Sequence, residues 1–306
     1  MRISVSLTPG TERPVTASEI AAFGDHIEAL GFHAIYLSDH YIAPHACFHS
    51  IAAATVIAAA TTRVKVGFAA YQVPLRHPIA VAKKFAMLDA LSEGRLIAGF
   101  AIGSTKPEFD ALGVPFGERG AIMDDAMDAI QTLWTEDVAS HAGPYFNFED
   151  VHLAPKPVQR PHPPIWLGTW TAAPRAAARV ARYADGWQAS GAHSVIADLP
   201  EGRASVERAC ETIGRDPATI GSAYVNTLIH FAESYEKAWA EFITLAARNK
   251  HRDPELGFLG DTNFIIAKLQ ELAEAGMDEV SFGLGVDEHE KANIIAQELM
   301  PRFSDA

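Results

Sequence analysis

The sequence predicts an α/β fold, a (β/α)8 TIM barrel, on three observations. Short apolar runs alternate with helix-like patterns nearly end to end along the 306 residues, an order typical of a parallel sheet flanked by helices. Eight of the apolar runs have the length of strands, and eight strands with their helices fit a closed barrel better than an open sheet. Apolar residues make up 48% of the chain and charged residues 21%, a composition typical of globular proteins.

We expect one barrel over residues 1–306, as a single domain. The predicted strands are Ile3–Leu7, Ala34–Ser38, Val64–Ala70, Leu96–Ala101, Ile165–Gly168, Gly186–Ala189, Ser222–Ile229 and Val280–Gly283. The predicted helices are Thr16–Leu30, His49–Thr61, Pro78–Leu91, Gly120–Trp134, Ala172–Ala184, Leu199–Ile213, Ser234–Leu245, Asn263–Ala275 and Glu288–Leu299.

Capping residues mark both ends of the first predicted helix and the end of a later one. Thr16 and Glu19 have the spacing of a capping box, in which each side chain accepts from the other residue's backbone N–H. Gly31 follows Leu30 where a left-handed C-terminal cap belongs, and Gly276 ends a later helix in the same way.

Two stretches depart from the alternation of strand and helix. Residues 135–164 contain six prolines and cannot form one long helix, so we expect an insertion that holds a small hairpin of Val138–His141 and Tyr145–Phe148. Residues 248–261 are predicted to be an irregular loop region. Long insertions of this kind in barrels are often lids or binding loops.

Charge and composition exclude several classes of function. The formal net charge of −13 and the lack of a Lys/Arg cluster argue against nucleic acid as a partner. No apolar run approaches the roughly 20 residues that span a bilayer, and the first residues lack the features of a signal peptide, so we expect a cytoplasmic protein. Cys47 and Cys210 lie far apart without a CxxC companion, which gives no basis for a zinc site or a disulfide framework.

His40 is the candidate catalytic residue. It follows the second predicted strand directly after Asp39, and in a (β/α)8 barrel the active site lies at the C-terminal ends of the strands. An imidazole there suits proton transfer, although Asp39 or His40 could instead cap a turn. His45 and His49 lie nearby, but Pro44 prevents a helix from placing them one turn apart, and no HExxH motif is present, so we predict no metal site.

Three further loops are candidates for contact with a cofactor. Small residues near Ala69 and Ala70, at the end of the third strand, would let a planar ring approach the backbone, or would simply pack in a tight barrel. Gly103–Thr105 follow the fourth strand but lack the spacing of a nucleotide motif. Gly168–Thr171 lead into a helix whose N-terminus could bind a phosphate, or could be an ordinarily capped one.

Taken together, these features resemble the luciferase-like monooxygenases and their relatives that use the deazaflavin coenzyme F420. The segments that carry the resemblance occur in order along nearly the whole chain. They are Leu30–Phe32, Leu37–His40, Ala60–Gly67, Pro74–Pro78, Leu88–Arg95, Glu108–Pro115, Pro155–Pro157, Pro163–Trp166, Ala184–Trp187 and Leu272–Gly276.

The resemblance implies a TIM barrel of the bacterial luciferase-like type, whose mouth holds a flavin or deazaflavin ring. His40 would then take part in hydride or proton traffic beside the ring. The bond between Ala69 and Ala70 would match a non-proline cis peptide of F420-dependent relatives. The other implied cofactor contacts are Asp39, Gly103, Ser104, Thr105 near the ring, and Gly168, Thr169, Trp170 and Thr171 near the phosphate.

The triplet Ser38–His40 favours F420 over FMN, because the sugar-phosphate dehydrogenases of the family carry the same triplet. Unlike them, this chain has Pro44 or His45 where they have a Trp, and Ser104 where they have an acid, so we do not expect it to oxidise glucose 6-phosphate.

The leading hypothesis is therefore an F420-dependent oxidoreductase acting on a small organic substrate. The alternatives are a monooxygenase using reduced FMN and oxygen, and a non-catalytic flavin-binding barrel. The resemblance also implies a homodimer. Four aromatic residues suggest a partly apolar substrate pocket: Tyr41, Phe48, Tyr71 and Trp170.

Overall fold

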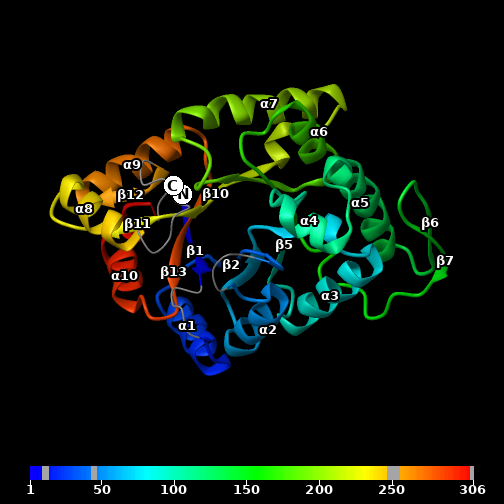
Figure 1. Ribbon diagram of the computed structural model, residues 1–306, viewed down its shortest axis with the longest axis horizontal. Coiled ribbons are helices and arrows are strands. Elements are labelled where there is room, and N and C mark those ends of the chain that lie inside the picture. The colour runs from blue at the N-terminus through cyan, green and yellow to red at the C-terminus, as the bar shows by residue number, and fades with distance from the viewer. Residues whose placement is uncertain (9–13, 43–46, 247–255, 304–306) are drawn as a thin grey trace.

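The chain folds into a closed parallel barrel surrounded by helices, as predicted (Figure 1). The computed structural model describes residues 1–8, 14–42, 47–246 and 256–303. Within these, the eight barrel strands are β1 (Arg2–Thr8), β2 (Ala34–Leu37), β3 (Lys65–Phe68), β5 (Leu96–Ala101), β8 (Ile165–Thr169), β9 (Gly186–Ser190), β10 (Gly221–Thr227) and β13 (Glu279–Gly285). Each pairs in parallel with its neighbours, and the pairing of β3 with β5 closes the barrel.

Helices cover the outside of the barrel, as Figure 1 shows. They are α1 (Ala17–Ala29), α2 (Ser50–Ala60), α3 (Pro78–Leu91), α4 (Lys106–Leu112), α5 (Arg119–Thr135), α6 (Pro174–Tyr183), α7 (Leu199–Thr212), α8 (Tyr235–Ala246), α9 (Thr262–Glu274) and α10 (His289–Ile294), which continues as a π-helical turn, Ile295–Leu299. The expected capping box of Thr16 and Glu19 is present, and Gly31 and Gly276 have the positive φ of a left-handed cap.

The predicted hairpin is confirmed. Strands β6 (Ala139–Ala142) and β7 (Asn147–Val151) pair antiparallel, and Figure 1 shows them outside the ring of helices, beyond α5. Asp125 of α5 anchors the hairpin: its carboxylate lies 2.7 Å from Nε2 of His141 and accepts from the backbone N–H groups of Tyr145 and Phe146 at 2.9 Å each.

Two predicted strand ends were wrong. The third strand ends at Phe68 rather than Ala70, because the peptide bond between Ala69 and Ala70 is cis, and a short strand β4 (Tyr71–Gln72) follows it. The seventh strand ends at Thr227, after Asn226 takes a left-handed φ of 61°. Its expected continuation is a separate strand, β11 (Ile229–Phe231).

The region 248–261 is not wholly irregular, contrary to prediction. Phe258–Gly260 forms β12, a buried strand too short to show a period in the sequence, and it pairs in parallel with β11. Residues 248–255 lie outside the described residues, as do Pro44 and His45. In the described part of the chain, no helix is long and apolar enough to cross a membrane.

The barrel interior is filled by one small cluster that leaves space at one end. Its apolar members are Ala34, Tyr36, Ala69, Ile97, Trp166, Ala223 and Val225. Gly99 of β5 lets β3 and β5 lie close together, since a Cβ at this position would lie 1.6 Å from the carbonyl oxygen of Phe68. The strands β3 and β5 can therefore meet directly below the open end of the barrel.

Candidate active site

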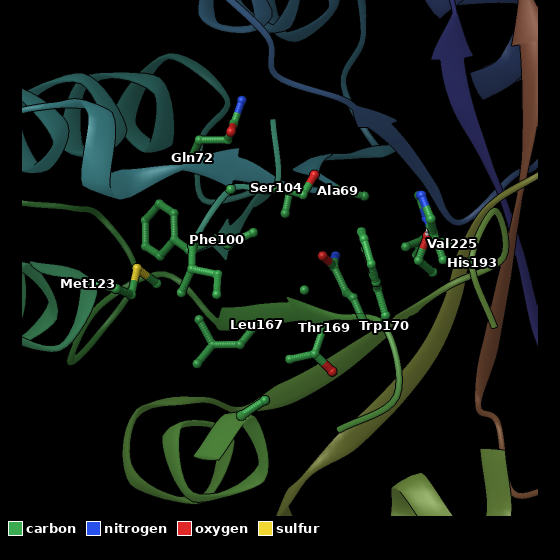
Figure 2. Close-up of a pocket in the computed structure, with 18 of the residues that line it drawn as sticks. Ala69, Gln72, Phe100, Ser104, Met123, Leu167, Thr169, Trp170, His193 and Val225 are labelled. Atoms are coloured by element: carbon green, nitrogen blue, oxygen red, sulfur yellow. Dashed lines mark hydrogen bonds between the residues drawn. The ribbon is translucent and has the colours of Figure 1, made fainter. Parts of the chain in front are cut away.

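A cavity of about 400 Å³ opens at the C-terminal ends of the strands, where the active sites of (β/α)8 barrels lie. It is lined by the last residues of β5, β8, β9 and β10, by the residues that follow β2, β3, β5, β8 and β9, and by side chains of α5 and α6. In Figure 2, Met123, Phe100 and Leu167 lie on one side of the pocket, and Val225 and His193 lie on the opposite side.

The structure brings nearly all the predicted site residues to this cavity. Those that line it are Asp39, His40, Ala69, Ala70, Gly103, Ser104, Gly168, Thr169, Trp170 and Thr171. Thr105 does not, because it is the N-cap residue of α4. Of the aromatic residues expected in the pocket, Tyr41, Phe48 and Tyr71 are not among its lining. Tyr71 is 1% exposed and belongs to the core.

Glu108 holds His40 in place. Oε2 of Glu108 lies 3.1 Å from Nδ1 of His40, while Oε1 accepts from the backbone N–H groups of Tyr41 and Ile42 at 2.6 and 3.0 Å. Glu108 is fully buried, whereas the side chain of His40 is 36% exposed. An acid does therefore lie beside His40, although the position of Ser104 had suggested that this chain lacks one.

Hydrogen bonds keep the Glu108 carboxylate ionised. Burial by itself raises the pKa of Glu108. Hydrogen bonds from the backbone N–H of Ile42 and from the side chains of Gln72 and His40 lower it by more, so the pKa of Glu108 lies below its usual value. An ionised carboxylate accepts from an Nδ1–H group, so it selects the tautomer of His40 in which Nε2 is the acceptor.

Asp39 is buried and bound by protein groups. Arg76 donates to both oxygens of its carboxylate, at 2.6 and 3.0 Å, and Ser50 Oγ and the backbone N–H of Gln72 donate at 2.7 and 3.0 Å. The Gln72 amide joins the two acids, because its Nε2 donates to the Asp39 carbonyl and to Glu108. Asp39 thus positions the strand end that carries His40.

The floor of the pocket is made of small side chains and amides. The bond between Ala69 and Ala70 is cis, as the resemblance implied, and Asn226 Nδ2 donates to the Ala69 carbonyl at 2.6 Å. A Cβ at Gly168 would lie 3.0 Å from Cβ of Ala70, so any side chain at Gly168 would crowd Ala70. Gln188 is buried and donates to the Phe68 carbonyl, while its Oε1 has no partner in the described residues.

One wall is an aromatic pair. The rings of Trp170 and His193 stack with centroids 4.3 Å apart and 6° between their planes, and Nδ1 of His193 lies 2.9 Å from Ser190 Oγ. Burial lowers the pKa of His193, which favours its neutral form. Nearby, Thr169 Oγ1 accepts from Trp187 Nε1 and from the backbone N–H of Ala172, so its own hydrogen remains available to a ligand.

Two arginines line the part of the pocket bordered by α5 and α6. Arg179 of α6 donates to Asp124 at 2.5 and 3.0 Å. Arg119 of α5 donates to the backbone carbonyls of Gly103 and Phe116 at 3.1 and 2.8 Å. No group of three or more residues suited to a metal ion occurs in the described ranges.

Sequence reasoning missed several of these groups. Glu108, Gln72, Gln188, Asn226 and Arg119 each need a tertiary contact to become visible. The sequence offered one signal for Glu108: it begins Glu108–Pro115, a segment that carries the family resemblance, and it directly precedes an apolar residue.

Residues 1–295 match the protein family described as luciferase-like monooxygenase. Over 144 residues the chain is 35% identical to the oxygenase component of the flavin-dependent trigonelline monooxygenase of Acinetobacter baylyi, a match that covers 45% of this chain and 39% of that protein. Over 149 residues it is 34% identical to the FMNH2-dependent dimethylsulfone monooxygenase of Pseudomonas putida, a match that covers 48% of this chain and 40% of that protein. The matches thus span less than half the length of these curated relatives.

Solved structures share the fold over the whole chain. The monooxygenase RslO1 from Streptomyces bottropensis superposes with a TM-score of 0.85 at 23% identity, covering 99% of this chain and 100% of that one. The coenzyme F420-dependent tetrahydromethanopterin reductase from Methanopyrus kandleri gives a TM-score of 0.81 at 20% identity, covering 99% of each. At these identities the likeness concerns the fold.

Proposed function

Because the chain belongs to the luciferase-like monooxygenase family, whose members are oxidoreductases, we propose that it binds coenzyme F420 in the mouth pocket and moves a hydride between that coenzyme and a small organic substrate. The observation that carries the proposal is the pairing of His40 with the buried Glu108 at the rim of the cavity. Hydride transfer to or from an alcohol or carbonyl carbon requires that a proton leave or reach the oxygen. His40, held by Glu108, would accept or donate that proton.

The pocket residues fit a flavin or deazaflavin ring. The small residues Ala69, Ala70 and Gly168 leave room for a planar ring against the floor of the pocket. The unpartnered Oε1 of buried Gln188 suits an N–H donor such as the one on the pyrimidine part of the ring. Gly103 and Ser104 would lie along the ring or its side chain. Thr169 and Thr171 would donate to the phosphate near the start of α6.

When bound, F420 accepts or donates the hydride. The protein orients the reactants and handles the proton. With Nδ1 of His40 held by Glu108, Nε2 can take the hydroxyl proton of an alcohol as its C–H hydride leaves, or return a proton to a carbonyl oxygen in the reverse direction. The stacked rings of Trp170 and His193 form one wall of the pocket.

A second candidate function is oxygenation with reduced FMN. It is favoured by the curated relatives at 34% and 35% identity, which are named as flavin-dependent and FMNH2-dependent monooxygenases. The same pocket would then hold the FMN ring.

Calorimetric titration of the purified protein with F420 and with FMN tests the choice. Tighter binding of F420 supports hydride transfer. Tighter binding of FMN, together with substrate-dependent oxygen consumption when a flavin reductase is added, supports the second function. Binding of neither contradicts both.

His40→Ala should lower kcat by at least about 100-fold, because a positioned general acid or base contributes a factor of this size or more. The Kd for the cofactor should change little, since the other residues that line the pocket are unchanged in this variant. Steady-state kinetics and calorimetry on the same preparations measure both. An unchanged kcat for His40→Ala would exclude the assigned role.

A further inference from the structure

A second cavity, which we call the rear cavity, lies at the opposite end of the barrel from the mouth pocket. Its volume is about 930 Å³, against about 400 Å³ for the mouth pocket. Its lining comes from the N-terminal ends of β1 and β3, from the residue before β2, and from residues near the ends of α1 and α9. The proposed function uses none of these residues.

Three basic side chains lie in a row along this cavity. Arg2, His33 and Lys65 stand at or directly before the first residues of the adjacent strands β1, β2 and β3. Backbone hydrogen bonds set their register: the N–H of His33 donates to the carbonyl of Ile3, and the N–H of Lys65 donates to the carbonyl of His33. Arg63, two residues before Lys65, adds a fourth basic side chain to the lining.

The carboxylates at this end of the barrel are already bound by protein groups. Both oxygens of Glu28 accept from backbone N–H groups of the turn before β3. Oδ2 of Asp278 accepts from the backbone N–H and the hydroxyl of Ser222 at 2.8 and 2.9 Å. Glu279 has no exposed surface, and burial raises its pKa, which favours the uncharged form.

Two of the cations, by contrast, have no carboxylate partner among the described residues. Lys65 makes no hydrogen bond or ion pair with this part of the chain, and Arg63 makes one long hydrogen bond, from Nη2 to the carbonyl of Glu28 at 3.5 Å. Both side chains are exposed at the rim of the cavity. In a protein whose formal net charge is −13, they form a local positive region that attracts anions.

Apolar side chains form the floor beneath these charges. Phe32, Val64, Met277 and Phe303 line the cavity, and each is between 3% and 9% exposed. A small inorganic anion would contact the rim alone. A ligand that also carries an apolar body would cover the floor and remove apolar surface from water, which adds affinity.

We propose that the rear cavity is a second ligand site, which binds an organic anion with its carboxylate or phosphate group against Lys65 and Arg63 and its apolar body on the floor. The site lies at the opposite end of the barrel from His40, so its ligand takes no part in the reaction at the mouth. The proposal therefore does not depend on which cofactor the mouth pocket holds.

The test uses four probes on the full chain: octyl phosphate, octanoate, 1-octanol and inorganic phosphate. The proteins are wild type, Lys65→Met, Arg63→Met and the control Arg208→Met. Methionine keeps an apolar stem without the charge. Arg208 is an exposed arginine of α7 that pairs with Glu201 and lines neither cavity. Calorimetry gives each Kd, and thermal melting confirms folding.

The stronger of the two organic anions should bind wild type at least about tenfold more tightly than 1-octanol or inorganic phosphate, because it contacts both the rim and the floor. Lys65→Met and Arg63→Met should each weaken that probe by about 3- to 10-fold, the effect of one charge-assisted contact. Arg208→Met should leave its Kd within about twofold of wild type. Comparison of octyl phosphate with octanoate identifies the preferred head group.

His33 provides a second readout that reports where the probe binds. Burial and the positive charges of Arg2 and Lys65 lower the pKa of His33 to about 4, and Glu279 lies 3.8 Å from its Nε2. An anion bound beside Lys65 would oppose those positive charges, so the pKa of His33 should rise when the probe saturates the protein. Titration of the imidazole signal by NMR, assigned with His33→Gln, measures this pKa.

Equal Kd values for wild type, Lys65→Met and Arg63→Met would overturn the proposal, as would an unchanged pKa of His33 in the bound protein. Binding of octyl phosphate and octanoate no tighter than that of inorganic phosphate would also overturn it, because the floor would then contribute nothing. Displacement of the probe by F420 or FMN would place it in the mouth pocket instead. Failure of both cofactors to bind contradicts the proposed function and leaves this site unaffected.

Discussion

At the scale of single residues, the site depends on a carboxylate that has no exposed surface. Glu108 accepts hydrogen bonds from the imidazole of His40, from the Gln72 amide and from two backbone N–H groups of the chain that follows β2. Removing its charge would leave those donors facing an amide, while the size of the side chain would stay the same. The expected consequence is loss of orientation at His40 rather than loss of the pocket.

Glu108→Gln should therefore lower kcat by about tenfold or more while the Kd for F420 stays within about twofold of wild type. The pH profile of kcat should also shift, because the charge beside His40 is gone. Glu108→Asp should restore part of the activity. The matched control is Asp110→Asn, an exposed position on the same helix that pairs with Lys106. A Glu108→Gln enzyme with the kcat and pH profile of wild type would show that the contact is only structural.

At the scale of elements, one carboxylate of α1 joins that helix to the start of β3. Glu28 accepts from the backbone N–H groups of Thr62, Arg63 and Val64, at 2.9, 2.5 and 2.8 Å for its Oε2. Burial raises the pKa of Glu28, but these hydrogen bonds lower it from 4.5 to about 2. The turn before β3 has its N–H groups satisfied in this way, and α1 is held against its neighbour α2.

Glu28→Gln should reduce the free energy of unfolding at pH 7 by about 2 kcal/mol, because the ionised form is the one that binds the three N–H groups. The folded-state pKa lies below the unfolded value, so this stability is present above about pH 4.5 and is lost as the pH falls toward 2. Urea denaturation at pH 7 and pH 3 measures the difference from wild type, which should shrink at the lower pH. Asp25→Asn, an exposed position on the same helix, is the control. A difference that does not depend on pH would contradict the role of the charge.

The sequence predicted those elements well whose hydrophobic pattern covers enough residues and whose ends carry a clear signal. Pro78–Leu91 and Leu96–Ala101 agree with α3 and β5 to the residue, since proline begins the one and a buried run defines the other. The helix α4 was missed, because seven residues give less than two full turns of pattern. The strand β12 was missed because its three residues are too few to show an alternating pattern.

The candidate site was predictable only where residues directly follow a strand. His40, Gly103 and Gly168 could be placed at the mouth from their order along the chain. Glu108 lies 68 residues from His40, and Arg119 starts a helix that returns to the cavity from outside the barrel. Such contacts depend on how helices pack over the strand ends, and no local pattern encodes that packing.

At the scale of the whole molecule, the two ends of the barrel have different roles. The C-terminal end holds the cavity, while the N-terminal end holds a buried Glu279 with Ser4, Arg2 and His33 around it. Burial and the positive charges of Arg2 and Lys65 lower the pKa of His33 from 6.5 to about 4. In (β/α)8 barrels, this end contributes stability rather than chemistry.

Because the folded state holds His33 neutral, the unfolded state binds more protons between pH 6.5 and 4, and wild type should lose stability as the pH falls through that range. His33→Gln should remove this loss, which is about 2 kcal/mol between pH 7 and pH 5. Urea denaturation at the two pH values measures it, with the exposed His152→Gln as control. The Kd for F420 should be the same in all three proteins. An equal loss of stability in His33→Gln and in wild type would refute the assignment.

The stacked pair on the pocket wall has a further, optical consequence. Trp170 is 50% exposed, whereas Trp134, Trp166 and Trp187 are buried in the barrel or under its helices. Flavins and deazaflavins absorb light in the range where tryptophan emits, so a ring bound beside Trp170 would accept its excitation energy. The protein thus carries an intrinsic spectroscopic probe in the wall of its own cavity, and occupancy of that cavity can be followed by emission without any added label.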